Sequence, residues 1–297
     1  GGVVKGIIDV YDNKSFLQIK LEQIKRTSQK YGIKIPIFLM NSFATSAPTI
    51  EYLEKNKYFG LRPDEIHIFD QFIFKRLNPD GSEFEPGNKN TPSRPCTQER
   101  DTPFEKRGIN TPDCNEKYYG PGHGDFPYAF RQSGLLDAFL KNSGKYVWFS
   151  NVDNLGATIN EIILGAHIKS GAEMTAELAE KYPGDKGGAP ALVNGKLQIV
   201  EQFKFPVSFN QNLINVFNSA TYIFTAEALK RDFNLPYYVV KKEVAGKKVI
   251  QFERLAGDLS IYLKANYVIV EREKRFIPIK TQEDLSRHRE FFKKKFG

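Results

Sequence analysis

Hydrophobic and polar positions follow two alternating periods along the first half of the chain. A continuous apolar run at 35–40 is typical of a strand buried on both faces, and 145–150 is a second expected strand. Segments 15–30 and 47–55 carry their apolar residues mostly at helical spacing. Because strands and helices alternate along the chain, the pattern predicts an α/β fold with a mixed, mostly parallel sheet and helices on both faces.

The pattern continues to the carboxyl end with hairpins added. Turn residues at Asn194-Gly195 and Gly246 indicate two hairpins, over 191–203 and 239–252. The other expected strands are 3–10, 65–74, 172–178, 221–224 and 268–273, and the other expected helices are 126–140, 158–170, 226–233, 255–264 and 282–296.

The periodicity stops between residues 78 and 117. Gly, Pro, Asn, Thr and charged residues dominate this stretch. Loops of this length inside a domain are uncommon and are often functional. We expect a surface excursion that acts as a lid, within a single domain over residues 1–297.

Composition and charge describe an ordinary globular protein. The chain has 297 residues, of which 40% are hydrophobic and 26% charged, and its net charge is +8. No basic run is interleaved with stacking aromatics, so a solvated basic surface is favoured over a nucleic-acid site. A cleft for small polyphosphates also fits, because it needs only a few lysines.

The cysteines, histidines and apolar runs of the sequence argue against several classes of protein. Cys96 and Cys114 could pair, but two cysteines make no disulfide framework, and no Cys/His cluster has zinc spacing. No apolar run is long enough to span a membrane and no signal peptide is visible. We therefore expect a cytoplasmic protein that binds neither membrane nor nucleic acid.

Two motifs carry candidate chemistry. Tyr119–Asp125 places three glycines around one His before a helix, which suits either a close approach to an anion or simply a tight loop. Ser150–Ala157 follows a strand and contains Asp153, which could hold Mg²⁺ against phosphate oxygens or cap a helix. Spacing alone leaves both alternatives open.

Together the motifs resemble the UDP-glucose pyrophosphorylase (UTP–glucose-1-phosphate uridylyltransferase) family. Pro-Gly-His-Gly-Asp at 121–125 matches its uracil and phosphate loop, and 150–157 matches its metal-binding segment. The resemblance extends from about Lys5 to Leu285. Segments 39–43, 69–71, 186–188, 195–201 and 275–281 agree with it in order.

Three features depart from the family pattern. The glycine-rich nucleotide loop is short, since Gly1-Gly2 is followed almost at once by Val3-Val4-Lys5, so the loop is either truly shortened or lacks residues here. The sugar-contacting Asn-Thr-Asn-Asn reads Asn-Ser-Ala-Thr at 218–221, which weakens the glucose assignment. The family's carboxy-terminal β-helix does not follow residue 297, so a monomer is expected.

The resemblance implies a Rossmann-like nucleotidyltransferase fold and a uridylyltransferase that forms a UDP-sugar and pyrophosphate from UTP and a sugar 1-phosphate, with glucose 1-phosphate first. It implies that Asp153 holds Mg²⁺, and that Lys5 and Lys280 are catalytic and neutralise phosphate charge. It assigns Gly2, Gln71, Gly122 and Asn151 to the nucleotide, and His123, Gly188, Glu201 and Asn218 to the sugar phosphate.

Two other functions remain open at this point. A UDP-N-acetylhexosamine or broad-specificity UDP-sugar pyrophosphorylase fits the altered 218–221 segment and the run at 57–61. A non-catalytic nucleotide-binding protein fits a chain that truly lacks the glycine loop. Without the resemblance, Lys5 and Lys280 could be ordinary solvated lysines.

Overall fold

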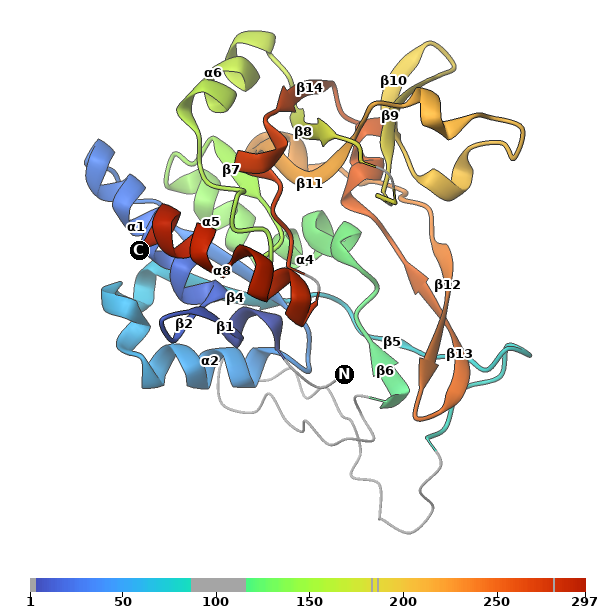
Figure 1. Cartoon of the computed structure of the whole chain (residues 1–297), viewed down its shortest axis with the longest axis horizontal. Coiled ribbons are helices and arrows are strands. Elements are labelled where there is room, and N and C mark those ends of the chain that lie inside the picture. The colour runs from blue at the N-terminus through green and yellow to red at the C-terminus, as the bar shows by residue number, and fades with distance from the viewer. Residues whose placement is uncertain (1–3, 87–115, 183, 186, 280) are drawn as a thin grey trace.

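The computed structural model describes every residue except 1–3, 87–115, 183, 186 and 280. The fold is α/β, as expected, with helices packed around small sheets, and the hairpin over residues 238–253 extends away from them (Figure 1). Most of the expected 78–117 excursion, both cysteines, Gly2 and Lys280 lie outside the described residues. None of the described helices is long and apolar enough to cross a membrane.

The largest sheet has four strands in the order β14 (Ala265–Val270), β8 (Met174–Glu180), β11 (Val216–Thr225) and β7 (Tyr146–Phe149). β14 runs parallel to β8, whereas β11 runs antiparallel to both β8 and β7. The mostly parallel arrangement is therefore not confirmed in this sheet. Apolar runs do not encode strand direction, and the described residues between β8 and β11 include no α-helix to make a crossover connection.

A second, parallel pair confirms the alternation seen near the start of the chain. β3 (Ile37–Asn41) pairs in parallel with β4 (Ile66–Asp70), and α2 (Ser46–Lys55) lies between them in sequence. Such a parallel pair requires a crossover connection.

α1 (Phe16–Tyr31) begins where its sequence supplies a cap. The Ser15 hydroxyl accepts a hydrogen bond from the Gln18 N–H at 3.1 Å. The helix ends at Gly32, whose φ is 62°.

The two hairpins form at the expected turns. β9 (Ala189–Val193) pairs with β10 (Lys196–Val200), and β12 (Tyr238–Val244) pairs with β13 (Lys247–Glu253). The two residues of each turn have positive φ, 50° and 77° in the first turn and 50° and 73° in the second. That geometry matches the twist of antiparallel strands.

Some boundaries differ from the expected ones for local reasons. The expected helix 126–140 is two helices, α4 (Phe126–Gln132) and α5 (Leu135–Lys141), because Gly134 between them has a φ of 76°. The expected strand at 3–10 is a 3-10 turn followed by a short strand. The remaining elements are η1 (Lys5–Ile7), β1 (Asp9–Tyr11), β2 (Lys14–Ser15), η2 (Lys57–Gly60), η3 (Pro63–Glu65), β5 (Phe74–Lys75), β6 (Tyr118–Tyr119), η4 (His123–Asp125), α6 (Glu161–Ser170), η5 (Gln202–Lys204), η6 (Gln211–Leu213), η7 (Ala226–Lys230), η8 (Ala256–Ile261), α7 (Arg272–Arg275) and α8 (Gln282–Phe296).

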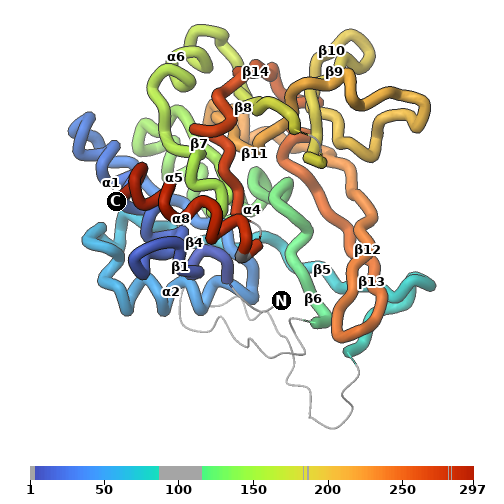
Figure 2. Tube along the Cα trace, in the orientation of Figure 1, coloured from blue at the N-terminus to red at the C-terminus, as the bar shows by residue number. Residues whose placement is uncertain are grey.

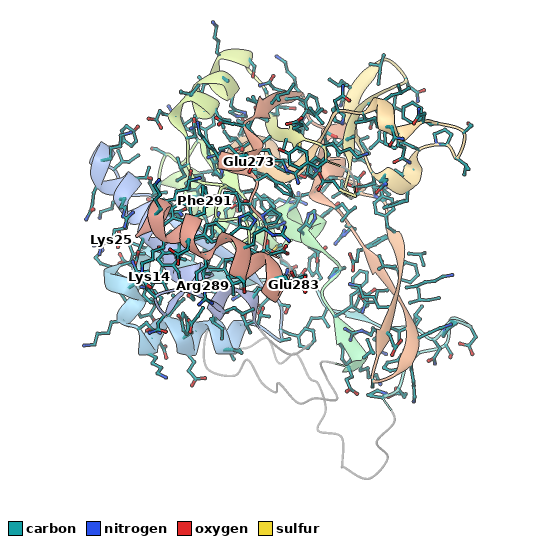
Figure 3. All side chains as sticks on the ribbon, viewed as in Figure 1. Lys14, Lys25, Glu273, Glu283, Arg289 and Phe291 are labelled. Atoms are coloured by element: carbon teal, nitrogen blue, oxygen red, sulfur yellow. The ribbon has the colours of Figure 1, made fainter. Side chains whose placement is uncertain are left out.

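The two ends of the described chain pack against each other (Figure 2). Phe292 and Phe296 of α8 join a buried cluster with Val10 of β1 and Phe16 of α1. Charged side chains of α8 such as Glu283 and Arg289 project outward (Figure 3). The last helix thus closes the core beside the start of the chain.

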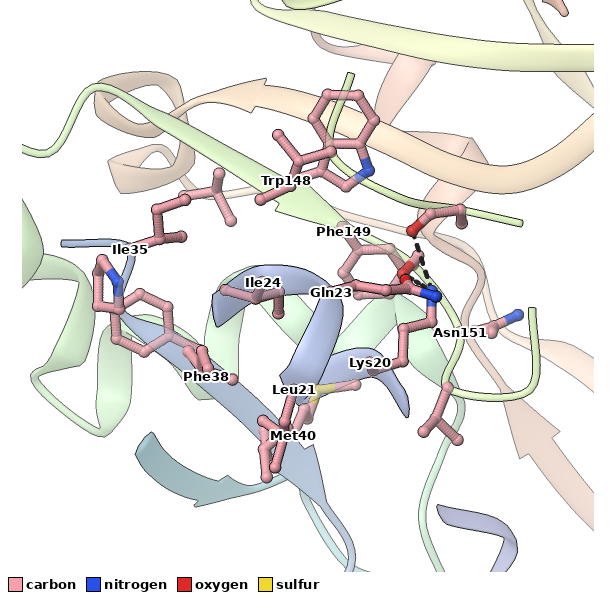
Figure 4. Close-up of a pocket in the computed structure, with 18 of the residues that line it drawn as sticks. Lys20, Leu21, Gln23, Ile24, Ile35, Phe38, Met40, Trp148, Phe149 and Asn151 are labelled. Carbon is pink, nitrogen blue, oxygen red and sulfur yellow. Dashed lines mark hydrogen bonds between the residues drawn. The ribbon is translucent and has the colours of Figure 1, made fainter. Parts of the chain in front are cut away.

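A buried ion pair fixes the loop that follows β7. Glu177 of β8 and Arg275 of α7 are 1% and 8% exposed, and the Arg275 Nε donates to Glu177 at 2.9 Å. The same guanidinium donates to the carbonyl of Thr158 at 2.8 Å. Lys20 of α1 holds the same loop, because its ammonium group donates to the carbonyl of Ala157 at 2.9 Å (Figure 4).

A cavity of about 930 Å³ lies between α1, β3 and β7 (Figure 4). Successive residues of both strands border it, as expected when the edge of a strand rather than one face meets a cavity. Its body is apolar, with Ile24, Phe38 and Trp148 among the lining residues. The candidate site residues Lys5, His123, Asn151 and Asp153 also line it.

Breaking the buried ion pair is expected to be costly. Replacing Arg275 by Met leaves the Glu177 carboxylate buried without its partner, which should lower the free energy of unfolding by ~3–5 kcal/mol. Lys75→Met, which removes one half of the exposed Lys75–Glu83 pair, should change it by less than ~1 kcal/mol. Urea unfolding measures both, and equal losses would contradict the special role of the buried pair.

Lys20 should make stability depend on pH. Burial, followed by the charge of Arg275, lowers the pKa of Lys20 to about 7. The unfolded chain then binds more protons than the folded one between about pH 7 and the ordinary lysine pKa of about 10.4, so wild-type stability relative to Lys20→Met should rise by ~3–5 kcal/mol across that window. Urea unfolding at about pH 6.5 and about pH 10 tests this, with Lys25→Met on the same helix as the control. A pH-independent difference would contradict it.

Candidate active site

The glycine-rich loop lies against the backbone that follows β13. The Gly124 N–H donates to the Arg254 carbonyl at 2.9 Å, and the Arg254 N–H donates to the Pro121 carbonyl at 2.7 Å. Gly122 has a φ of 91°, and a Cβ there would lie 2.6 Å from the Arg254 carbonyl oxygen. Gly122 is therefore required both by backbone angle and by close packing.

Asp125 joins this loop to the neighbouring strand end. It is fully buried, accepts a hydrogen bond from the Phe72 N–H at 2.9 Å, and is ion-paired with Arg254. Burial raises the pKa of Asp125, while the charge of Arg254 opposes that shift. The pair holds the backbone next to Gln71 in place.

Gln71 lies where the sequence expects a nucleotide-reading residue. Its side chain packs directly against Gly120, leaving no room for a Cβ on that glycine. Its Oε1 and the nearby Asn41 Nδ2 are buried and have no hydrogen-bond partner among the described residues. An unpaired buried amide is costly, so these atoms are well suited to bind a ligand with complementary polar edges.

His123 is held in a defined state. Its Nδ1 accepts a hydrogen bond from the Ala256 N–H at 3.0 Å, which requires a neutral ring with the proton on Nε2. Burial lowers the pKa of His123 and favours the same neutral form. The remaining Nε2–H can serve as a donor to a phosphate or sugar oxygen.

Asp153 and Lys5 meet in the lining of the cavity. The Lys5 ammonium lies 2.7 Å from Asp153 Oδ2, although the two residues are far apart in sequence. The Ile279 N–H donates to the Asp153 carbonyl at 3.2 Å, and Asn154 binds the backbone of Ile277. The segment leading to residue 280 therefore runs beside Asp153, while exposed Asn151 precedes it in the same loop.

The donor set at Asp153 suits a divalent cation bound mainly by a substrate. Within the described part of the chain, no three His, Cys, Asp or Glu side chains gather to form a complete metal site. Mg²⁺ needs only one or two protein carboxylates when phosphate oxygens and water supply its other ligands. Asp153 offers one such carboxylate, with a lysine beside it to balance phosphate charge.

Three of the four residues expected at the sugar phosphate, Gly188, Glu201 and Asn218, come together. The Asn218 N–H donates to the Gly188 carbonyl at 2.7 Å, and a Cβ on Gly188 would lie 2.8 Å from Glu201 Oε1. The Asn218 amide donates to the Tyr222 hydroxyl at 2.6 Å. Burial, followed by the charge of Asp258, raises the pKa of Glu201 to about 7.

Several supporting residues were missed at the sequence level. Arg254 and Asp258 stand in no motif, and Lys20 looked like one more lysine on a helix. Asp125 was visible inside its motif, but its pairing with Arg254 joins segments distant in sequence. For Lys20, one signal was present, because its position lies among apolar residues of an amphipathic helix.

Comparison with known proteins agrees with this geometry. The family model described as UTP–glucose-1-phosphate uridylyltransferase matches residues 2–294. UTP–glucose-1-phosphate uridylyltransferase 2 of Dictyostelium discoideum is 32% identical over 95% of this chain and 53% of its own length. The chain thus spans about half the length of the curated relatives it matches.

Solved structures share the fold. A mutant of Leishmania major UDP-glucose pyrophosphorylase in complex with UDP-glucose superposes with a TM-score of 0.73, at 24% identity over 95% of this chain and 60% of that one. A candidate UDP-N-acetylglucosamine pyrophosphorylase from Entamoeba histolytica gives 0.75, at 20% identity over 98% and 78%. Together with the match along nearly the whole sequence, these findings show that the chain belongs to the UTP–glucose-1-phosphate uridylyltransferase family.

Proposed function

We propose that this chain is the catalytic core of a uridylyltransferase that joins UTP to a sugar 1-phosphate, glucose 1-phosphate first, and releases pyrophosphate. The observation that carries the proposal is the contact of Lys5 with Asp153 at the end of β7, beside a segment that leads to Lys280. The family assignment and a structural neighbour crystallised with UDP-glucose support it.

The chemistry needs positioning and charge neutralisation rather than a strong base. A sugar 1-phosphate oxygen is already anionic, so it can attack the α-phosphorus of UTP in line while pyrophosphate leaves. Lys5 neutralises developing charge on the phosphates, and Lys280 is proposed to do the same. Asp153 would hold Mg²⁺, which supplies charge neutralisation for the phosphates when bound.

Two different sets of residues are proposed to recognise the base and the sugar. Gln71 and the Gly122 backbone are proposed to read the uracil, with Gly2 and Asn151 supporting the nucleoside. His123 donates to the phosphate or the sugar through Nε2. His123 contacts Ala256 at the start of η8, and the next residue, Gly257, packs beside Asn218. This contact connects His123 to the proposed sugar residues.

A UDP-N-acetylhexosamine or broad-specificity enzyme is the second candidate. β11 loses its regular register between Asn218 and Tyr222, and Ala220 there has a φ of 56°. The two asparagines of the family segment are therefore replaced at a bulge, where side-chain direction changes. The shared fold of the Entamoeba histolytica protein is consistent with this alternative.

We further propose that the described sheets belong to one Rossmann-like nucleotidyltransferase domain. Two observations support this: the parallel β3–β4 pair and β7 border the same cavity, and α8 packs on β1 and α1. A monomer remains our expectation.

Asp153→Asn should abolish turnover while preserving the fold. Loss of the carboxylate removes the proposed Mg²⁺ ligand, so pyrophosphate release from UTP and glucose 1-phosphate should fall by ~10²–10⁴-fold. Asp64→Asn, an exposed aspartate on the surface, is the matched control and should retain full activity. A wild-type protein that binds UTP but turns over no sugar 1-phosphate would instead favour a non-catalytic nucleotide-binding protein.

The glycine loop allows a comparison at matched backbone angle. Gly122 and Gly81 have φ of 91° and 88°, but a Cβ would clash with Arg254 only at Gly122, since nothing lies within 4 Å at Gly81. Gly81→Ala should cost ~1 kcal/mol of stability with normal turnover, whereas Gly122→Ala should also raise the KM for UTP at least ~10-fold. Equal kinetics for the two variants would show that close packing of this loop does not matter for nucleotide binding.

A further inference from the structure

A buried carboxylate that the proposed mechanism does not use, that of Asp258, lies beside the partly buried Glu201 and Asn218. Asp258 of η8 is 1% exposed. Its Oδ1 accepts a hydrogen bond from the Tyr238 hydroxyl at 3.0 Å and lies 3.5 Å from the Lys204 ammonium. Its Oδ2 is buried and has no hydrogen-bond partner among the described residues.

The neighbours of Asp258 are the proposed sugar residues. A Cβ on the adjacent Gly257 would lie 3.3 Å from Asn218 Nδ2 and 3.4 Å from the Tyr222 hydroxyl. The charge of Asp258 also contributes to raising the pKa of Glu201. Asp258, Glu201 and Asn218 therefore form one polar cluster, reached from three separate segments of the chain.

This cluster contains more acceptors than internal donors. The Glu201 carboxylate has no hydrogen bond or ion pair with another side chain in the described part of the protein, and Asp258 is satisfied on one oxygen only. A buried polar atom left unpaired costs ~1–3 kcal/mol, and more when it is charged. Burial accordingly raises the pKa of Asp258, against the opposing charge of Lys204.

We propose that Asp258 is a specificity-determining residue of the sugar subsite, whose free Oδ2 accepts a hydrogen bond from one ring hydroxyl while Glu201 accepts from another. This inference rests on the proposed uridylyltransferase function. Sugar hydroxyls are donors, so a bound hexose 1-phosphate relieves the unpaired state of both carboxylates. A sugar without the matching hydroxyl leaves Oδ2 unpaired and is rejected.

The test couples one side chain to one hydroxyl. Initial rates are measured at saturating UTP with glucose 1-phosphate and each of its monodeoxy analogues, for wild type, Asp258→Asn and the surface control Asp64→Asn. Asp258 and Glu201 are proposed to bind different hydroxyls, so two different analogues should be poor substrates of the wild type. The analogue that lacks the hydroxyl bound by Asp258 should lose ~10²–10³-fold in kcat/KM. In Asp258→Asn the penalty for that analogue should shrink to less than ~10-fold, because the site no longer holds an unpaired carboxylate. The KM for UTP should stay within about twofold of wild type.

A purely structural role for Asp258 would give a different result. It would lower activity with every sugar by the same factor and leave the ratios between analogues unchanged, and that outcome overturns the inference. If Asp258→Asn does not fold, Tyr238→Phe takes its place, since it removes only the hydroxyl that binds Oδ1. That variant should shift the ratio for the same analogue, and an unchanged ratio overturns the proposal. Turnover with unaltered ratios would refute only this inference, whereas no turnover with any sugar would refute the proposed function as well.

Discussion

The arrangement of the site depends on the buried ion pair between Glu177 and Arg275. The guanidinium binds β8 through Glu177 and the loop after β7 through Thr158. The backbone that follows Arg275 then runs beside Asn154 and Asp153. A charge buried this deeply is stable only with its partner, so the pair fixes which segments meet. The Lys5–Asp153 contact is placed by that constraint.

The residues proposed to bind the nucleotide and those proposed to bind the sugar are connected through the segment that follows β13. The glycine loop binds the carbonyl of Arg254, and His123 binds the N–H of Ala256 two residues later. From there η8 continues directly to Asp258 beside the sugar cluster. If the glycine loop shifts when a nucleotide binds, the segment 254–258 would therefore move with it and displace Asp258 at the proposed sugar subsite.

Local chemistry made much of the fold predictable from the sequence. α8 was expected at 282–296 and is found there, with Thr281 as its cap, and both hairpin turns have the backbone angles that Asn194-Gly195 and Gly246 require. The direction of β11 was not predictable, because apolar runs carry no sign of strand direction. Arg254 and Asp258 were missed for a related reason, since their partners are distant in sequence and no local pattern reveals a buried charge pair.

Across the cavity between β3 and β7, two strand edges face each other, and the described residues form no ladder between them. Gln23, Asn41 and Trp148 all line it, and each has buried polar atoms with no hydrogen-bond partner among the described residues. Edges in this state are templates for further pairing, which proteins usually cover. An extended peptide segment entering there would gain backbone hydrogen bonds on both sides and join two separate sheets into one continuous sheet.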